Sequence, residues 1–195
     1  MNKDFEDYFE DDEILESVNK YYRMLEANRI FYFDVYEIEN IIDFFLDEDQ
    51  PDIARDVLHI GLKQHPSSSE LRLKEAEVLV IDGKPISALS ILKDIERIEP
   101  NNIDIFLLKG ISYNSMNDTI QARKSFNHAI ALHHSENDQI CFQIARSLEE
   151  SGDFAMAVEY LEKAYKYNNK NYAVIYELAY CLEKLNKDKR SIKFY

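Results

Sequence analysis

Residues that form turns are scarce in this chain. Its 195 residues include 4 glycines and 4 prolines. Because glycine and proline separate regular elements, their scarcity predicts long regular segments with few interruptions. The composition excludes a disordered chain, since 46% of the residues are hydrophobic and 12% are aromatic. The sequence therefore predicts a folded protein.

Cysteines and long apolar runs are scarce as well. The two cysteines, Cys141 and Cys181, follow no metal-binding or disulfide spacing, which is typical of a protein kept reduced in the cytoplasm. The acidic N-terminus lacks the basic and apolar regions of a signal peptide. Apolar stretches such as 30–33 are too short to cross a membrane. We therefore expect a cytoplasmic protein with no membrane partner.

Positive charge is also in short supply. The formal net charge is −14, and most of it comes from residues 1–52, where seventeen acidic residues face four basic ones. Nucleic-acid binding depends on neutralised phosphates, so this excess argues against a nucleic-acid partner. Residues 1–12 are interpreted as a flexible acidic tail that keeps the protein in solution. The alternative is that this acidic segment attracts a basic partner.

What the sequence does contain is a repeat with a period of 34 residues. Three series of residues recur at this period: Pro66, Pro100 and Asn169; Asp49, Gly83, Asn117, Gly152 and Asn186; and Ala54, Ala88, Ala122, Ala157 and Ser191. A period of that length is typical of stacked helical hairpins. The aligned repeats are 35–68, 69–102, 103–136, 138–171 and a truncated 172–195, with Asn137 as an insertion in a loop.

Each repeat divides into two helical patterns around a short polar turn. In the second repeat the first helix is predicted over 70–81, followed by the turn 82–84. The second helix begins near Pro85, whose missing N–H is harmless in a first turn, and it ends before Pro100, which cannot continue a helix. Small residues recur where the helices would cross, as at Gly110 and Gly61. A glycine inside a helix costs about 1 kcal/mol relative to alanine, so close packing is expected there.

A further helix is predicted over 13–27, ahead of the repeats. Its apolar residues fall on one side, namely Ile14, Leu15, Val18, Tyr21, Tyr22 and Leu25, and its polar residues on the other, namely Glu13, Glu16, Lys20, Arg23 and Glu26. The first hairpin of a repeat array needs a cover with a polar outer side. We therefore expect residues 13–34 to form a capping helix and a loop. Asp34 and Glu37 have capping-box spacing at the start of the next helix.

The repeats resemble the tetratricopeptide repeat family over residues 35–195. The residues that carry the resemblance are Gly110 with Tyr113, Ala145 with Leu148, the turn residues Gly83 and Gly152, the series at Ala54, the series at Leu58, Leu92, Phe126 and Leu161, and the closing Pro66 and Pro100. Lys109 and Ile95 depart from the family pattern. The acidic prefix with a lone helix is similar to bacterial members. The resemblance implies an all-α fold, a right-handed α-solenoid of antiparallel helix pairs.

Motifs of catalysis and cofactor binding are missing from the sequence. There is no glycine-rich phosphate loop, no His-Glu-x-x-His and no Gly-x-Ser-x-Gly. His133 and His134 are adjacent in a predicted loop, and we interpret them as surface residues rather than metal ligands. The sequence therefore predicts no enzyme activity, no cofactor and no metal site.

In the family, the first helix of every repeat lines a concave groove. The residues that face the groove are at places 2, 5, 6, 9 and 12, counted from the first residue of each repeat. The resemblance therefore implies a partner-binding groove with an acidic first part and an apolar stripe, formed by Glu39, Asp43, Leu73, Glu77, Leu107, Leu108, Ile111, Phe142, Arg146, Tyr176 and Tyr180. The alternative is that the apolar members pack against neighbouring helices. The expected partner is a protein or peptide segment that is apolar with some positive charge.

Chaperone-binding members of the family hold an acidic C-terminal tail with a clamp of lysine, asparagine and arginine. The first three repeats instead have Glu39, Asp43, Lys74, Asp104 and Leu108 at the clamp places. The sequence therefore predicts that such a tail is not the partner.

Two other functions stay open. One is RNA binding, supported only by a basic cluster near the end, Lys184, Lys187, Lys189, Arg190 and Lys193. The other is a regulatory or sensor domain of a longer protein, because the fifth repeat stops partway at Tyr195. Ile192 and Tyr195 would leave an apolar face uncovered there, which could also lead to self-association.

Overall fold

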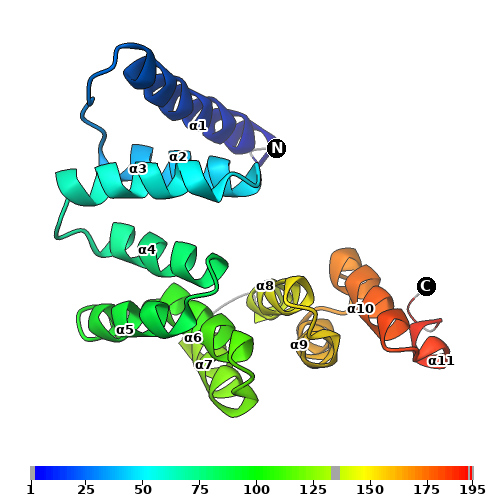
Figure 1. Cartoon of the computed structure of the whole chain (residues 1–195). Helices are drawn as coiled ribbons and strands as arrows, with labels where there is room; N and C mark the ends of the chain where they lie inside the picture. Colours follow the sequence, from blue (N-terminus) through cyan, green and yellow to red (C-terminus); the bar gives the residue numbers. More distant parts are fainter. Residues whose placement is uncertain (1–2, 133–136, 193, 195) are drawn as a thin grey trace. The chain divides into compact units, whose positions relative to one another are not determined.

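A computed structural model describes residues 3–132, 137–192 and 194 (Figure 1). Within these residues the regular structure is entirely α-helical, which confirms the predicted fold class of helix pairs. The helices are α1 (Lys3–Glu26), α2 (Val35–Asp47), α3 (Pro51–Gln64), α4 (Ser69–Ile81), α5 (Pro85–Glu96), α6 (Ile103–Ser115), α7 (Thr119–Leu132), α8 (Asn137–Glu150), α9 (Phe154–Tyr167), α10 (Tyr172–Lys184) and α11 (Asp188–Ser191). His133, His134, Lys193, Tyr195 and the side chain of Lys189 lie outside the described part.

The chain divides into two compact units, Met1–Asp82 and Gly83–Tyr195. Unit 1 contains α1 to α4 and unit 2 contains α5 to α11. The division falls in the turn between α4 and α5, so it cuts the predicted repeat 69–102. Within unit 1, α4 packs against α2 and α3, and within unit 2, α5 packs against α6. Among the described helices, none combines the length and the hydropathy that crossing a membrane requires.

The turns between paired helices explain one of the periodic series. Asp49, Gly83, Asn117, Gly152 and Asn186 all have a positive φ, between 55° and 80°. Glycine, asparagine and aspartate tolerate this left-handed conformation better than other residues do. At four of these turns the next residue donates its N–H to the carbonyl five positions back, as Asp153 does to Leu148 at 2.8 Å. The series therefore marks the left-handed end of each first helix.

Unit 1 is built on the apolar side of α2. Ile38, Ile41, Ile42 and Phe45 are fully buried there. A Cβ atom at Gly61 of α3 would lie 2.8 Å from Ile38 and 3.1 Å from Leu71 of α4. Gly61 therefore lets α3 approach both neighbouring helices, as the small-residue pattern predicts.

Unit 2 has a similar close crossing between α6 and α7. A Cβ atom at Gly110 would lie 2.3 Å from the Phe126 ring, and that ring packs edge-on against Tyr160 of α9 at 5.5 Å. Lys109, where the family pattern has an apolar residue, is ion-paired with Glu96 of α5 and lies over the Phe106 ring at 5.5 Å. Its stem therefore stays packed while its charge is compensated.

The structure corrects the expected start and orientation of the first helix. α1 begins at Lys3, so residues 3–12, expected to be an acidic tail, are helical. Ser17, Val18, Tyr21 and Met24 form its buried face. Three residues of the predicted apolar side are instead about half exposed, namely Leu15, Tyr22 and Leu25. The predicted side was too wide, because the described part of α1 packs mainly against α2 and one main neighbour covers only a narrow stripe.

Lys20 and the loop after α1 hold this helix in place. Lys20, predicted on the outer side, pairs with Glu37 of α2 at 2.5 Å and lies over the Phe33 ring at 4.8 Å. The Gln64 amide donates to the carbonyl of Phe31 at 2.7 Å and accepts from the N–H of Phe33 at 2.9 Å. Asp34 and Glu37 form the predicted capping box at the start of α2. These contacts fix residues 31–34, the part of the loop next to α2.

Candidate protein-binding surfaces

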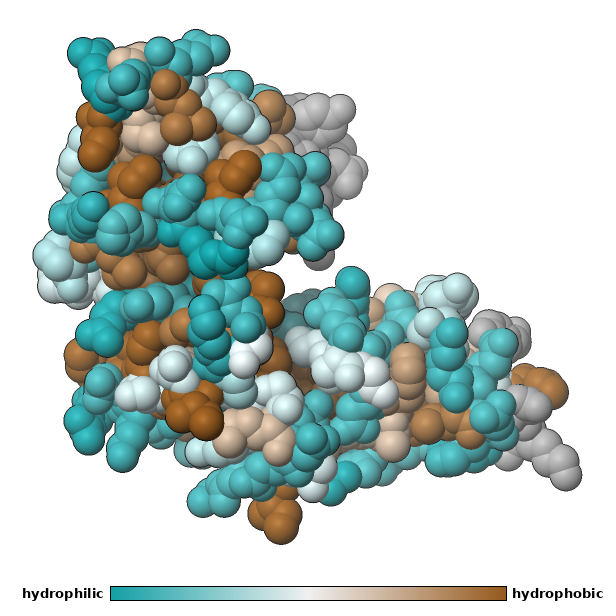
Figure 2. All heavy atoms as spheres, viewed as in Figure 1, coloured by the Kyte–Doolittle hydropathy of each residue, from teal (hydrophilic) through white to brown (hydrophobic). Residues whose placement is uncertain are grey.

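The first helices of the repeats bring the predicted groove places together within each unit. In unit 1, a surface hollow between the starts of α2 and α4 is lined by Tyr36, Glu39 and Glu70, with His65 and Pro66 on its edge. In unit 2, a second hollow is lined by Asp104 of α6 and by Gln139 and Gln143 of α8. Two neighbouring first helices therefore line each hollow, α2 with α4 in unit 1 and α6 with α8 in unit 2. Figure 2 shows apolar residues, in brown, reaching the surface among hydrophilic ones.

Lys74 is the central charge of the unit 1 surface. Its ammonium group lies 2.5 Å from the Asp43 carboxylate and 3.1 Å from that of Glu77. Burial lowers the pKa of Lys74, but Glu77 and Asp43 more than offset this effect, so the pKa is raised overall. Two of the predicted groove acids, Asp43 and Glu77, are therefore already neutralised by the protein itself.

Glu39 is in a different position from these two acids. It is half-buried, and burial raises the pKa of its carboxyl group. Lys74 opposes the rise, while Asp43 and Glu70 add to it. The effect of Lys74 is smaller than that of burial, so the pKa of Glu39 stays raised.

The apolar and aromatic groove candidates of unit 2 lie outside the lining of the hollow between α6 and α8. Phe142 of α8 and Tyr180 of α10 are half-buried and pack on the core of unit 2, as does Ile111 of α6. Tyr176 of α10 is 61% exposed. Arg146 of α8, at groove place 9, is also exposed. The Tyr180 ring also lies edge-on to Phe154 at 6.3 Å and beneath the ammonium group of Lys184 at 5.0 Å. Tyr180 is thus fixed, whereas most of Tyr176 faces solvent.

Three more apolar groove candidates differ in how far they are buried. Leu107 is only 7% exposed and belongs to the buried core of unit 2, so it presents no surface to a partner. Leu108 and Leu73 are half-buried. The packing alternative therefore holds for Leu107, because its side of α6 is covered by the core.

Acidic groups also meet between α8 and α10. The pKa of Glu149 is raised, mainly by burial and further by Glu177. The hydrogen bond with the Cys181 thiol has the opposite effect and lowers this pKa. Burial is also the main cause of the raised pKa of Cys181. Glu149 and Glu177 lie at groove places 12 and 6 of their repeats. The sequence did not predict that they meet, because they are on different helices and no fixed spacing relates them.

Residues outside the repeats contribute to the unit 1 surface. The Tyr36 hydroxyl donates to the Glu13 carboxylate of α1 at 3.1 Å. Glu13 was expected on the outer side of the capping helix, so the sequence did not place it here. Tyr36 is 49% exposed at groove place 2. α1 therefore adds an acidic group to the edge of this surface.

Sequence comparison identifies the repeats. Residues 148–195 match the profile of the tetratricopeptide repeat family. Residues 148–195 therefore belong to the tetratricopeptide repeat family. The match covers α9 and α10, where the turn at Gly152 and the small residues Ala157 and Ala164 follow the repeat pattern. The comparison with curated protein sequences gave no match.

Solved structures with the same fold extend over most of the chain. PilW, described as a widely conserved type IV pilus biogenesis factor, is 14% identical, with a TM-score of 0.61 over 82% of this chain and 74% of PilW. PilF of Pseudomonas aeruginosa is 19% identical, with a TM-score of 0.56 over 81% of this chain and 71% of PilF. MamA is 18% identical, with a TM-score of 0.52 over 84% of this chain and 92% of MamA. At these identities the likeness establishes the fold.

Proposed function

We propose that this tetratricopeptide-repeat protein is a non-catalytic interaction scaffold that binds segments of other proteins on the faces of its first helices. The observation that carries the proposal is the exposure of Tyr176, which leaves 61% of a large aromatic residue in solvent. It occupies the same helix place as Phe142, and Tyr180 follows it one turn later on α10. Aromatic residues at such positions are enriched in protein interfaces.

The chemistry of the two surfaces favours an apolar segment that carries some positive charge. In unit 2 the aromatic row suits leucine, isoleucine or phenylalanine anchors at helical spacing. In unit 1 the half-buried Glu39, which lines the hollow, suits a lysine or arginine. The two surfaces are proposed as separate binding faces, one in each unit.

The test for unit 2 compares two exposed tyrosines. Tyr176→Ser removes the proposed anchor, whereas Tyr167→Ser removes a tyrosine that is 56% exposed on α9, a second helix. Proteins captured from cell extract by the wild-type chain are identified by mass spectrometry, and their binding to both variants is measured. A partner lost with Tyr176→Ser and kept with Tyr167→Ser supports the proposal. Equal binding to all three proteins contradicts it.

A second copy of the chain is the alternative partner. Ile192 is 72% exposed after α11, and an uncovered apolar residue at that place could contact another molecule. Sedimentation at increasing protein concentration separates the two cases, because only self-association depends on the concentration of this chain alone.

We place this function in the cytoplasm. Cys141 and Cys181 are both free and buried, which suits a reducing compartment.

A further inference from the structure

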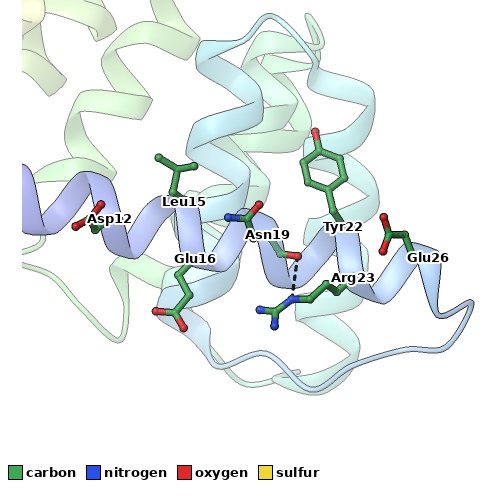
Figure 3. A pocket seen from close by; sticks show the side chains of 7 residues that line it. All are labelled: Asp12, Leu15, Glu16, Asn19, Tyr22, Arg23 and Glu26. Carbon is green, nitrogen blue, oxygen red and sulfur yellow. Dashed lines mark hydrogen bonds between the residues drawn. The ribbon is translucent and has the colours of Figure 1, made fainter.

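One side of α1 carries a strip of three apolar residues that are about half exposed. Leu15 is 54% exposed, Tyr22 is 46% exposed and Leu25 is 53% exposed. Figure 3 shows Leu15 and Tyr22 on one side of α1, with Glu16 and Arg23 on the other. The Tyr22 ring also lies edge-on to the buried Phe45 ring of α2 at 6.2 Å. The strip therefore continues from the core of unit 1 to the surface.

Acidic side chains border this strip. Asp12, Glu16 and Glu26 line the same shallow hollow as Leu15 and Tyr22. Among the described residues that line this hollow, Arg23 is the one cation, and its Nε donates to the backbone carbonyl of Asn19 at 3.3 Å. The face is therefore apolar along one edge and net negative along the other.

The spacing of the lining residues indicates the shape that fits this face. They are Asp12, Leu15, Glu16, Asn19, Tyr22, Arg23 and Glu26, which recur three or four positions apart. Side chains at this spacing form the ridges into which a second helix packs. A helix laid along α1 would meet apolar residues at Leu15 and Tyr22 and acidic residues near both ends of the hollow.

We propose that this face of α1 is a docking surface for an amphipathic helix of a partner protein, one with lysine or arginine beside its apolar stripe. Leu15, Tyr22 and Leu25 receive the apolar residues of that helix, and Asp12, Glu16 and Glu26 attract its cations. Burial of the apolar side chains supplies the affinity, and the acids select basic partners and speed their encounter. This surface is separate from the first-helix faces of the repeats.

The test uses a defined probe, a synthetic amphipathic helix of leucine and lysine, with a matched helix of leucine and glutamate. Binding to the full chain is measured by calorimetry. The Leu15→Ser/Tyr22→Ser double variant is expected to bind the lysine helix at least about tenfold more weakly, as loss of interface anchors predicts. The control is Ile98→Ser/Ile120→Ser, which changes two residues that are each 76% exposed in unit 2. This control should bind like the wild type.

Charge reversal tests the acidic border. The Glu16→Lys/Glu26→Lys variant should lose the lysine helix and gain the glutamate helix, and raising the salt concentration should weaken wild-type binding. The first-helix faces are also proposed to take apolar, basic segments, so the effect of Leu15→Ser/Tyr22→Ser is measured in the Tyr176→Ser background as well. The same loss in both backgrounds assigns it to α1, and a failure of the first-helix proposal leaves this result unaffected. Thermal melts verify that each variant is folded.

Three results would overturn the proposal. The first is equal binding of the lysine helix to the wild type and to Leu15→Ser/Tyr22→Ser. The second is equal binding of the lysine and glutamate helices to the wild type. The third is a concentration-dependent dimer that Leu15→Ser/Tyr22→Ser abolishes, because a second copy of the chain would then be the occupant of this face.

Discussion

The ring of Phe126 fills the space beside Gly110 that a side chain would need, since a Cβ atom there would lie 2.3 Å from the ring. Gly110→Ala must therefore move the ring or separate α6 from α7. We expect a loss of about 1–3 kcal/mol of unfolding free energy, as for other overpacked cores. Urea denaturation measures this change.

Gly61→Ala is the matched control for that change. At Gly61 the closest atom to an added Cβ is the Ile38 side chain at 2.8 Å, which can rotate more readily than a buried ring. The loss should therefore be smaller than for Gly110→Ala. If Gly110→Ala leaves the unfolding free energy unchanged, the claim that α6 and α7 cross too closely for a side chain at this position is wrong.

Gly152 tests the left-handed turns. Its φ is 80°, and no atom lies within 4 Å of an added Cβ, so only backbone strain opposes a side chain. Gly152→Ala should lower the unfolding free energy by about 1–2 kcal/mol. Gly152→Asn should lower it less, because asparagine holds the same place at Asn117 and Asn186. Equal effects of the two substitutions would argue against this explanation of the periodic series.

The Gln64 amide should fix the loop between α1 and α2. Gln64→Met removes the hydrogen bonds to Phe31 and Phe33 while keeping an apolar stem. We expect a loss of about 1–3 kcal/mol, because both backbone groups lose their partner. Amide hydrogen exchange should speed up at Phe33 in this variant. Unchanged exchange at Phe33 would show that the bond to Gln64 does not protect it.

Glu39 is expected to lower the free energy of unfolding and to raise the affinity for a basic partner segment. Because its folded-state pKa is raised, mainly by burial, the ionised carboxylate disfavours the folded state above that pKa. Glu39→Gln should therefore be more stable than the wild type at pH 7. As the pH falls through the folded-state pKa the wild type gains a proton, and the difference should vanish below the unfolded-state value of about 4.3.

The same variant should bind a basic partner segment less tightly, because it lacks the carboxylate. Denaturation at pH 7 and pH 4, together with calorimetry of partner binding, measures both effects. A variant that is less stable at pH 7 would contradict the pKa argument, and one that binds unchanged would remove Glu39 from the surface.

The sequence predicted the helices and turns well, because these depend on local physics. The 34-residue series marks residues such as Gly152, which must adopt a left-handed turn, and Gly110, which must admit a neighbouring ring. These requirements act within one hairpin. They therefore recur from hairpin to hairpin and are visible as a period in the sequence.

The parts that depend on distant neighbours were harder to predict. Periodicity shows which side of a helix is apolar, but not how much of that side another helix covers. Leu107 is therefore buried where a groove residue was expected, and Leu15 is exposed where a buried residue was expected. The division after Asp82 also has no signal in the sequence, since the turn there resembles the turns at the other repeats.

The central claim is that the first-helix face of unit 2 binds a partner segment through Tyr176. The most direct measurement is the dissociation constant of a captured partner for the wild type, Tyr176→Ser and Tyr167→Ser, with thermal melts of all three proteins. We predict about a tenfold or greater loss of affinity for Tyr176→Ser, almost none for Tyr167→Ser, and nearly equal melting temperatures. Equal affinity of the two variants for the partner would contradict the claim.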